Sequence, residues 1–429
     1  MSEYRIIGGN AASGEVLISG NKNAALPCLA ATLLTDDPIR LSNVPEIEDV
    51  KVMIALLESL GSSVVREGKG VYTIQSGRGG ASLPKDLVQA VRGSILLLGP
   101  LLARNGEVTI PPPGGDVIGL RRLDTHFIGL SALGASAKLN EDGSLHFKIT
   151  GRGLIGNDIF LDEASVTATE NVIMAASLAE GETTVFNAAC EPHVQDLCHL
   201  LVRMGSSIEG IGSNRLIITG SKKLTGASYT LGFDYMEAGS FIGLAAATGG
   251  QVLIRGIDHQ HLRMLQLGFE RIGIAWEHDG PSSILVPKKQ RKVLVKEVGG
   301  QTTKIDSAPW PGFPADLLSI LTVAATQSRG SILIHEKMFE SRMYFIDWLI
   351  RMGADIILCD PHRAVVQGPS VLIGSVLSSP DVRAGMALVI AAAAARGESV
   401  IQNIYQIERG YENLSEKLTS LGIDMVRSG

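Results

Sequence analysis

Apolar positions repeat one pattern six times along the chain, at intervals of about seventy residues. Each copy predicts a helix of apolar spacing that ends in a hydrophobic residue, a glycine and a β-prone stretch. A repeat of this length predicts a fold of equivalent units, with sites formed between units. The copies are LLESLGSSV, LSALGASAK, LVRMGSSIE, FERIGIAWE, LIRMGADII and LTSLGIDMV, with glycines at Gly61, Gly134, Gly205, Gly273, Gly353 and Gly422.

Upstream of each copy lies a second helix that is apolar on nearly every face, which predicts that it is buried. A strand follows this helix, and two strands joined by a turn close the unit, as in SSVVREGKGVYTIQ. Each unit therefore reads as helix, strand, helix, strand, turn, strand. The buried helices are expected in KNAALPCLAATLL, RGSILLLGPLLARNG, ATENVIMAASLAEG, MEAGSFIGLAAATGG, FPADLLSILTVAATQSRG and VRAGMALVIAAAAARG.

Six such units predict an α/β protein of two domains with three units each. We expect the first domain at residues 21–232, and the second at residues 1–20 plus 233–429, with the break near ITGSKKLTGASYTLGFDY. Residues 1–20 hold an orphan strand pair, YRIIGG and GEVLISG, which should complete the sheet of the C-terminal half. The chain then crosses twice between domains, which favours a hinge and a ligand in the cleft.

Composition and charge limit the class of protein to which the chain can belong. Apolar residues make up 45% of the chain and charged residues 19%, as in soluble globular proteins. The net charge of −6 argues against general affinity for nucleic acid or anionic membranes. The N-terminus lacks the apolar core of a signal peptide, and LVIAAAAA is too short to span a bilayer. The four cysteines show no CxxC pairing, so we expect reduced thiols in a cytoplasmic protein.

Charges near the starts of the buried helices differ between units. A cation at a helix N-terminus costs about 0.3–1 kcal/mol, unless an anion compensates for it. Three cations at equivalent positions favour an anion site, although each alone also fits a solvated surface residue. The expected first turns carry acids at Glu170, Glu237 and Asp316, and cations at Lys22, Arg92 and Arg383.

Three further arginines and one loop also favour an anion site. Arg121, Arg342 and Arg409 follow a loop or strand, and together with the helix cations they suit a small ligand that carries phosphate and carboxylate. The loop at 110–122 contains PPPGGD, in which prolines stiffen the approach and glycines permit a tight turn before Asp116. It reads either as an ordinary turn or as a mobile lid that brings one acid to the site.

These motifs resemble the UDP-N-acetylglucosamine enolpyruvyl transferases (1-carboxyvinyltransferases) of peptidoglycan synthesis. The resemblance runs end to end, through NKNAALP, PPGGDVIGLRRLDTH, SAPWPGFPADLLS, MFESR, SSPDVRAG and IYQIERGYE. It implies two inside-out α/β domains of three repeats each. It also implies transfer of the enolpyruvyl group of phosphoenolpyruvate to the 3′-hydroxyl of UDP-N-acetylglucosamine, with release of phosphate. Such a cytoplasmic transferase serves cell-wall biogenesis, cell shape and division, as a monomer or weak homo-oligomer.

The resemblance also implies residue roles. Lys22 would hold phosphoenolpyruvate and offset developing charge, Asn23 would bond the intermediate, Asp316 would act as the base and Asp116 as the proton donor. The reaction needs no metal and no cofactor, only a dry cationic pocket with an acid and a base. Phosphoenolpyruvate would be held by Lys22, Asn23, Arg92, Arg121 and Arg409. The UDP-sugar would be held by Arg92, Arg121, Arg122, Leu123, Asp124, Thr125, Ser165, Val166, Thr167, Asp316 and Met338, and domain closure would involve Arg342, Asp381 and Arg383.

The chain departs from the family pattern at several places. Asp116 stands where most members have a lid cysteine, so fosfomycin, which alkylates that thiol, should find no target. An aspartic acid has an ordinary pKa of about 3.9, which burial must raise before it can donate a proton at neutral pH. Near the nucleotide, Arg122 replaces a usual proline, Glu163 a lysine, Thr167 a glycine and His193 an acid.

Three other functions compete with this hypothesis. The enolpyruvyl transferase that acts on shikimate 3-phosphate shares the fold, but it lacks KNAALP and the PGGD lid. A non-catalytic paralogue that binds a nucleotide sugar and regulates a partner would have no need to retain Lys22, Asp316, Arg121 and Arg409. An RNA 3′-phosphate cyclase relative is disfavoured, because the chain has neither a basic face nor that enzyme's histidine signature.

Overall fold

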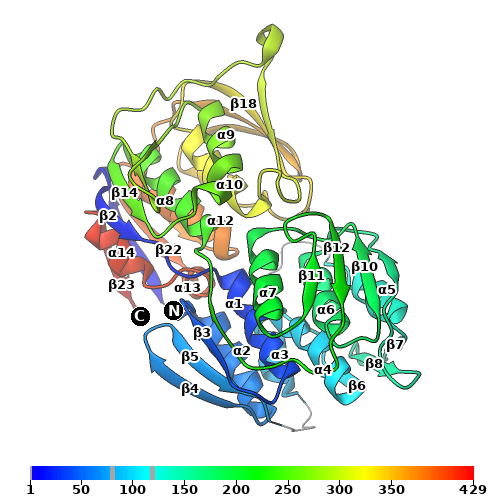
Figure 1. Cartoon of the computed structure of the whole chain (residues 1–429). Coiled ribbons are helices and arrows are strands. Elements are labelled where there is room, and N and C mark those ends of the chain that lie inside the picture. Colours follow the sequence, from blue (N-terminus) through cyan, green and yellow to red (C-terminus); the bar gives the residue numbers. More distant parts are fainter. Residues whose placement is uncertain (1, 78–82, 116–120) are drawn as a thin grey trace. The chain divides into compact units, whose positions relative to one another are not determined.

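The structure, a computed structural model, describes residues 2–77, 83–115 and 121–429, which form two compact units. Of these residues, unit 1 is built from 2–19 together with Phe233–Gly429, and unit 2 from 20–77, 83–115 and Arg121–Gly232. Figure 1 draws unit 2 in blue to green, and most of unit 1 in green to red. Each unit has its own hydrophobic core.

The elements of unit 2 follow the predicted order of helix and strands in each repeat. Its helices are α1 (Lys22–Ala31), η1 (Thr32–Leu34), α2 (Glu48–Ser59), α3 (Lys85–Ala90), η2 (Arg92–Leu97), α4 (Leu98–Asn105), α5 (Asp124–Ala132), α6 (Val166–Ala176) and α7 (Pro192–Arg203). Its strands are β3 (Ile39–Ser42), β4 (Ser63–Gly68), β5 (Val71–Gln75), β6 (Glu107–Ile110), β7 (Ala135–Leu139), β8 (Leu145–Ile149), β9 (Asp158–Phe160), β10 (Glu182–Phe186), β11 (Ser207–Glu209), β12 (Arg215–Thr219) and β13 (Ala227–Thr230).

Unit 1 repeats the plan. Its helices are α8 (Tyr235–Thr248), η3 (His259–Leu262), α9 (Arg263–Arg271), η4 (Val298–Gly300), α10 (Ala315–Ala325), α11 (Ile346–Arg351), α12 (Val382–Ala394), α13 (Tyr405–Glu408) and α14 (Leu414–Ser420). Its strands are β1 (Glu3–Gly8), β2 (Ser13–Leu17), β14 (Gln251–Arg255), β15 (Glu277–His278), β16 (Ser283–Val286), β17 (Thr303–Asp306), β18 (Gly330–His335), β19 (Asp355–Asp360), β20 (Arg363–Gly368), β21 (Val376–Ser378), β22 (Gly397–Gln402) and β23 (Asp424–Ser428).

Three central helices form the middle of each unit, and sheets surround them. In unit 1 these are α8, α10 and α12, which pack on one another and are buried along nearly their whole length. In unit 2 they are α1, the η2–α4 segment and α6. The prediction of buried first helices is therefore confirmed for all six repeats.

The sheets share one strand order. In each described four-stranded sheet, an edge strand pairs in parallel with the strand after the central helix. The last strand of the repeat separates that strand from the middle one in five of the described sheets, and β1 takes this place in the sixth. In the described residues the orders are β13-β3-β5-β4, β6-β8-β7 and β9-β10-β12-β11 in unit 2, and β2-β14-β16-β15, β17-β18-β20-β19 and β21-β22-β1-β23 in unit 1.

The repeat glycine has one structural reason at all six positions. Each lies directly after the second helix of its repeat and has a positive φ, where a side chain would be strained. The turn that it allows sends the chain from the outer helix back into the sheet. The φ values are 84° at Gly61, 98° at Gly134, 103° at Gly205, 75° at Gly273, 97° at Gly353 and 81° at Gly422.

The N-terminal strand pair completes the C-terminal half, as predicted, but it serves two sheets and not one. β1 lies between β22 and β23 and pairs antiparallel with both, so Glu3 lies beside Ser428. β2 joins a different sheet, parallel to β14. The N and C ends of the chain accordingly lie side by side in Figure 1.

The position of β1 predicts that two neighbouring isoleucines contribute very differently to the free energy of unfolding. Ile6 is fully buried in the core, whereas the next residue, Ile7, is 51% exposed on the opposite face of the strand. Ile6→Ala should lower the free energy of unfolding by about 2–4 kcal/mol, because it leaves a cavity. Ile7→Ala, the matched control, should change it by less than about 0.5 kcal/mol. Urea unfolding measures both, and equal losses would contradict this placement of β1.

Candidate functional site

Lys22, the first residue of α1, is held by an ion pair. Its Nζ lies 2.6 Å from Oδ2 of Asp49, and both side chains are largely buried. Asn21 caps the helix, since its side chain accepts from the N–H groups of Asn23 and Ala24. The helix end therefore offers fewer free N–H donors than we expected, and an anion that binds Lys22 has to compete with Asp49.

Arg92 and Arg121 form a second cationic pair in unit 2. Nη2 of Arg92, at the start of η2, donates to the backbone carbonyl of Arg121 over 3.1 Å. Burial, and then the neighbouring charge of Arg121, lower the pKa of Arg92 to about 10. Arg92 remains protonated at neutral pH, so this pair concentrates positive charge in a half-buried place. An anionic ligand would relieve that repulsion.

Asp162 organises the predicted nucleotide segment at the start of α5. Its Oδ2 accepts from Nη2 of Arg122 over 3.0 Å, and its Oδ1 accepts from the Thr125 hydroxyl over 2.8 Å. Nε of Arg122 also donates to Asp124 over 3.2 Å. The charge of Arg122 is thus balanced locally. Leu123, at the helix N-cap, lies between these residues in the chain and makes no side-chain cap bond.

The start of α6 differs from that of α1, because its N-cap residue Ser165 makes no side-chain cap bond. Thr167, which stands where the resembling family has glycine, places its hydroxyl oxygen 3.2 Å from Nε2 of His126. The first-turn N–H groups of α6, including that of Val166, therefore remain available to an anion.

His126 is a site residue that the sequence reasoning missed, although it ends the LDTH motif. Its Nδ1 lies 3.2 Å from Nδ2 of Asn171, an amide donor, so Nδ1 accepts and Nε2 carries the proton. Asn171 also accepts from the N–H of Gly99, which ties α5, α6 and α4 together. Burial, and then Arg92, lower the pKa of His126 to about 3, so the ring is neutral.

In unit 1, Asp316 lies between two guanidinium groups. Its Oδ1 is 2.6 Å from Nη2 of Arg342 and its Oδ2 is 3.1 Å from Nε of Arg383. Burial would raise the pKa of Asp316, but the two arginines outweigh it and hold the pKa well below its usual range. The carboxylate is a firm hydrogen-bond acceptor here, and it would have to leave an arginine before it could take up a proton.

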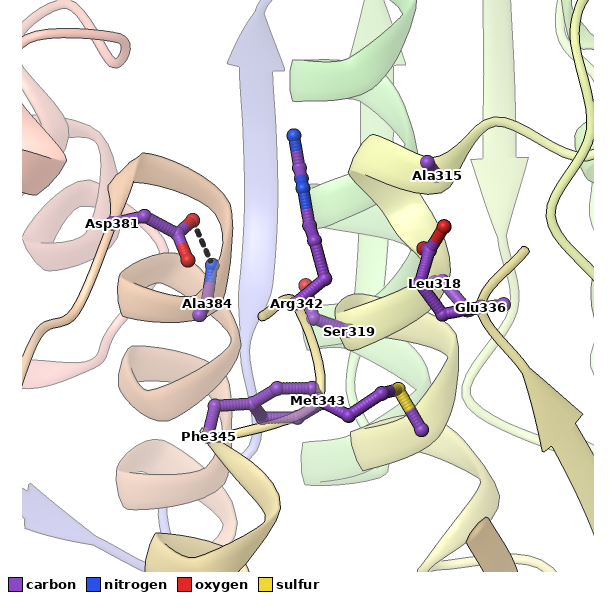
Figure 2. Close-up of a pocket in the computed structure, with 9 residues that line it drawn as sticks. All are labelled: Ala315, Leu318, Ser319, Glu336, Arg342, Met343, Phe345, Asp381 and Ala384. Atoms are coloured by element: carbon purple, nitrogen blue, oxygen red, sulfur yellow. Dashed lines mark hydrogen bonds between the residues drawn. The ribbon is translucent and has the colours of Figure 1, made fainter. Parts of the chain in front are cut away.

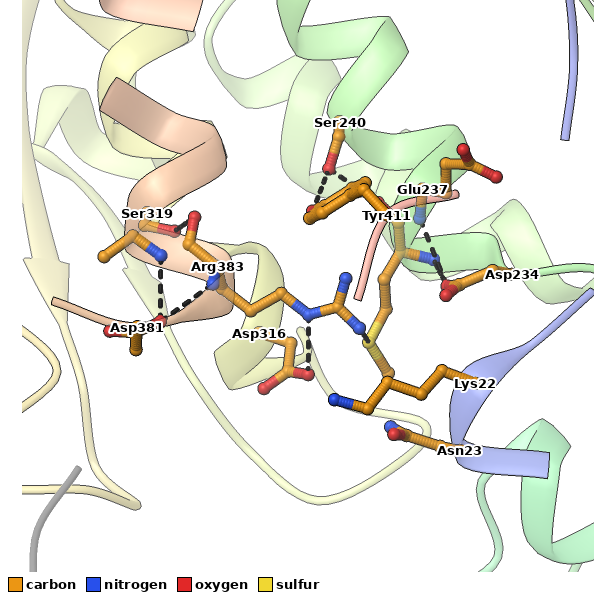
Figure 3. A network of polar contacts seen from close by, with 12 residues as sticks. Lys22, Asn23, Asp234, Glu237, Ser240, Asp316, Ser319, Asp381, Arg383 and Tyr411 are labelled. Carbon is orange, nitrogen blue, oxygen red and sulfur yellow. Dashed lines mark hydrogen bonds and ion pairs between the residues drawn. The ribbon is translucent and has the colours of Figure 1, made fainter. Parts of the chain in front are cut away.

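Arg383 is buried among groups that fix its position. Nη2 contacts Sδ of Met236 at 3.2 Å, and the guanidinium lies over the ring of Tyr411, 5.3 Å from its centroid. Figure 3 shows this side chain between Asp316 and Tyr411, with Tyr411 bonded in turn to Ser240. Asp381 caps α12 by accepting from the N–H groups of Arg383 and Ala384, so this helix end too is already satisfied.

Arg342 also borders a small cavity of about 10 Å³, whose walls Figure 2 draws. Nε of Arg342 and Oε2 of Glu336 are buried there without a hydrogen-bond partner among the described residues. The space suits a single water and is too small for a substrate. The other oxygen of Glu336 accepts from the N–H groups of Met338 and Phe339, which fixes the backbone at Met338.

Three further residues that the sequence singled out are Arg409, Glu170 and Asp116. Arg409 lies at the end of α13, is buried, and donates to Gln406 over 3.0 Å. Glu170 is not in a first turn as expected, since α6 begins at Val166 and places it one turn further in, where it is buried. Asp116, the predicted acid, lies outside the described residues.

Two absences are findings about the described residues alone. In that part of the chain, no group of three or more His, Cys, Asp or Glu side chains is arranged to hold a metal ion. Within the same residues, no helix has the length and apolar character needed to cross a bilayer.

Comparison with known proteins defines the class. The family model of EPSP synthase (3-phosphoshikimate 1-carboxyvinyltransferase) matches residues 6–418, and the chain belongs to this family of enolpyruvyl transferases. It is similar over its length to proteins named UDP-N-acetylglucosamine 1-carboxyvinyltransferase. The one from Treponema denticola is 57% identical over 99% of this chain and 98% of its own, and that from Bradyrhizobium diazoefficiens is 50% identical over 99% and 98%.

Solved structures support the fold. The enolpyruvyl transferase NikO from Streptomyces tendae has a TM-score of 0.86 at 24% identity, over 100% of this chain and 99% of its own. An EPSP synthase from Acinetobacter baumannii has a TM-score of 0.74 at 18% identity, over 100% of both chains. The predicted enolpyruvyl transferase fold of repeated α/β units is confirmed.

His126 allows a test by pH. A histidine whose pKa is lower in the folded than in the unfolded state stabilises the protein least in acid, and the loss begins as pH falls through the unfolded value near 6.5. Between pH 6.5 and 5, the parent protein should therefore lose about 2 kcal/mol of unfolding free energy relative to His126→Gln. Urea unfolding at several pH values measures this difference.

The control is His199→Gln, which changes an exposed histidine on α7 of the same unit. Its stability should follow the parent protein at every pH. A His126→Gln variant that also follows the parent in parallel would show that His126 is not held neutral.

Proposed function

We propose that this chain transfers the enolpyruvyl group of phosphoenolpyruvate to the 3′-hydroxyl of UDP-N-acetylglucosamine. The observation that carries the proposal is the 57% identity, over nearly the whole of both chains, to an enzyme named for this reaction. The chain is thus an enolpyruvyl (carboxyvinyl) transferase that makes a peptidoglycan precursor. Cell shape and division depend on that precursor.

The reaction proceeds by addition and elimination. The 3′-oxygen of the sugar attacks C2 of phosphoenolpyruvate while C3 gains a proton, and the hydroxyl proton passes to a base. The tetrahedral intermediate then loses phosphate from C2 and a proton from C3, which leaves the enol ether. Charge develops on the carboxylate and phosphate during both steps, so positioned cations supply most of the stabilisation.

Unit 2 supplies cations and an open helix end for this chemistry. We assign Lys22 and Asn23 to phosphoenolpyruvate, with Asp49 holding Lys22 until the substrate arrives. Arg92 and Arg121 would bind phosphate or carboxylate, and their mutual repulsion favours such a ligand. The uncapped start of α6, with Ser165, Val166 and Thr167, suits the phosphate groups of a nucleotide sugar.

Unit 1 supplies the groups assigned to the sugar hydroxyl and to closure. Asp316 would orient the 3′-hydroxyl through a hydrogen bond, and it would accept the proton only after a guanidinium moves away. Arg342, Arg383 and Asp381 are positioned to respond to such a movement, since two of them hold Asp316 and the third caps α12. Arg409 would bind the carboxylate or phosphate, and Met338 would contact the UDP-sugar.

The rival acceptors are less well supported. A shikimate 3-phosphate transferase shares the fold with this chain, but the related structure of that class is only 18% identical. A silent regulatory paralogue would have no need for the buried pairs that hold Lys22 and Asp316. The substrates and the free thiols favour the cytoplasm as the site of the reaction.

A phosphate-release assay tests the function. The protein should release phosphate from phosphoenolpyruvate with UDP-N-acetylglucosamine and not with shikimate 3-phosphate. Lys22→Ala should lower the rate by about 100-fold or more, because it removes a charge at the reacting group. Lys51→Ala, which changes an exposed lysine on α2, should keep the full rate. Release with shikimate 3-phosphate alone, or a full rate in Lys22→Ala, would refute the proposal.

The response to fosfomycin tests the prediction that Asp116 stands in place of the lid cysteine. It should not inactivate the protein with time, because Asp116 offers no thiol, whereas Asp116→Cys should become sensitive. Burial raises the pKa of Cys190 to about 11 and that of Cys198 to about 12, so these thiols are unreactive at neutral pH. The exposed Cys359 is removed in a Cys359→Ser control. Inactivation that persists in this control would contradict the prediction.

A further inference from the structure

Arg342 is the less firmly held of the two arginines that pair with Asp316. Arg383 is fixed further, because it also contacts Met236 and lies over the ring of Tyr411. Among the described residues, the guanidinium of Arg342 donates a hydrogen bond to Asp316 alone. If one guanidinium has to move away before Asp316 can accept a proton, Arg342 is therefore the one with fewer hydrogen bonds to lose.

A second carboxylate, that of Glu336, lies close to Arg342. Glu336 follows β18 and is fully buried, and its Oε2 has no hydrogen-bond partner among the described residues. Both residues line the cavity of about 10 Å³ in unit 1, and Figure 2 draws their side chains around it. Nε of Arg342 is buried there and also lacks a partner in the described part of the chain. Because an unpaired buried donor and acceptor are both costly, the two favour a contact across this space, directly or through one water.

The rest of Glu336 is held in place. Its Oε1 accepts from the hydroxyl of Ser307 over 2.7 Å, and from the N–H groups of Met338 over 2.8 Å and Phe339 over 3.3 Å. Its backbone N–H donates to the carbonyl of His362 over 2.8 Å. Three donors at one oxygen match an ionised carboxylate, which accepts and does not donate. Oε2 therefore has a fixed position at which it can receive a cation.

The ring of Phe339 gives Arg342 a surface over which it can shift. The guanidinium carbon of Arg342 lies 5.1 Å from the centroid of this ring. The backbone N–H of Phe339 donates to Glu336, so the ring is anchored beside the second carboxylate. A cation stays attracted to an aromatic face while it remains within about 6 Å of the centroid, so a small shift keeps this contact.

Asp381 is the other carboxylate near this arginine. Burial lowers the pKa of the guanidinium, but the carboxylates of Asp316, Asp381 and Glu336 outweigh burial and raise the pKa. Asp381 is already engaged at the start of α12, where its Oδ1 accepts from the N–H groups of Arg383 and Ala384. Glu336 has a buried oxygen without a partner in the described residues, so it is the better acceptor.

We propose that Glu336 is a positioning residue for Asp316, because it receives Arg342 when that arginine leaves Asp316. The sugar hydroxyl would take the place of Arg342 at Asp316, and Arg342 would move to Oε2 of Glu336. The charge of the arginine then stays compensated inside the protein. Asp316, with one cation fewer beside it, becomes the better proton acceptor. The catalytic role rests on the proposed function, whereas the exchange of partners does not.

A mutant cycle tests the exchange without using catalysis. Asp316→Asn removes the charge that holds Arg342, so the arginine should pass to Glu336 in this variant. Glu336→Gln should then raise the unfolding equilibrium constant about tenfold more in Asp316→Asn than in the parent protein, as measured by urea unfolding. The glutamine keeps Oε1 as an acceptor for Ser307 and the backbone, so the difference reports the loss of the charged Oε2.

Asp381→Asn is the matched control for this cycle. It removes the competing carboxylate, while its amide oxygen keeps the cap of α12. Its effect on the unfolding equilibrium constant should differ by less than about threefold between the parent protein and Asp316→Asn. Arg342→Met should abolish the difference seen with Glu336→Gln, because no cation is then left to exchange. If the Asp316→Asn/Glu336→Gln variant does not fold, adding Arg342→Met should restore folding.

Steady-state kinetics test the catalytic role of Glu336. Glu336→Gln should lower kcat for phosphate release by about tenfold or more, because Arg342 then stays on Asp316. The KM for UDP-N-acetylglucosamine should change by less than about threefold, since Glu336 positions another residue and does not bind the substrate. Glu277→Gln, at an exposed position of β15, should leave both constants unchanged.

Two sets of results would overturn the proposal. Equal effects of Glu336→Gln in the parent protein and in Asp316→Asn would rule out the exchange, as would a larger difference for Asp381→Asn. An unchanged kcat, or a loss confined to KM, would rule out the positioning role. If the protein releases no phosphate with UDP-N-acetylglucosamine, the proposed function fails, and the mutant cycle still decides whether Arg342 passes to Glu336.

Discussion

The fold depends on the burial of its central helices. Helices such as α8, α10 and α12 are apolar on nearly all faces, so none is stable in water unless sheets and outer helices enclose it. Three helices packed together and wrapped by three sheets meet this requirement, and both units use the same solution. The requirement also confines chemistry to helix ends, because a polar residue within these helices would need a buried partner. Lys22, Arg92, Asp316 and Arg383 all obey this rule.

At two of those ends, opposite charges are matched. Asp49 holds Lys22 within unit 2, and Arg342 and Arg383 hold Asp316 within unit 1. Buried charges need such partners, because an isolated one would be costly in a poorly solvated place. In the proposed roles, a substrate would exchange one set of ion pairs for another, which would limit the gain in affinity but make the response selective for correctly placed anionic groups.

Much of this organisation could be predicted from the sequence because it is local or periodic. The repeat, the buried helices and the hairpins each follow from spacing within a few tens of residues. The two N-terminal strands around Ile6 belong to none of the six repeats, so their pairing with the C-terminal half could also be predicted. The partners of the site residues could not be predicted in the same way. Asp162 meets Arg122 across forty positions, and Arg383 meets Asp316 across 67. Glu170 was misplaced because the start of a helix depends on its cap, which periodicity does not reveal.

The central position of β1 has a consequence for biosynthesis. This strand precedes both of its neighbours, β22 and β23, by nearly four hundred residues of the chain, so it is synthesised long before either of them. The described strands of unit 2 are complete once residue 230 is made, whereas β1 still lacks both of its neighbours at that point. During that interval β1 has unpaired edges, which can join other chains.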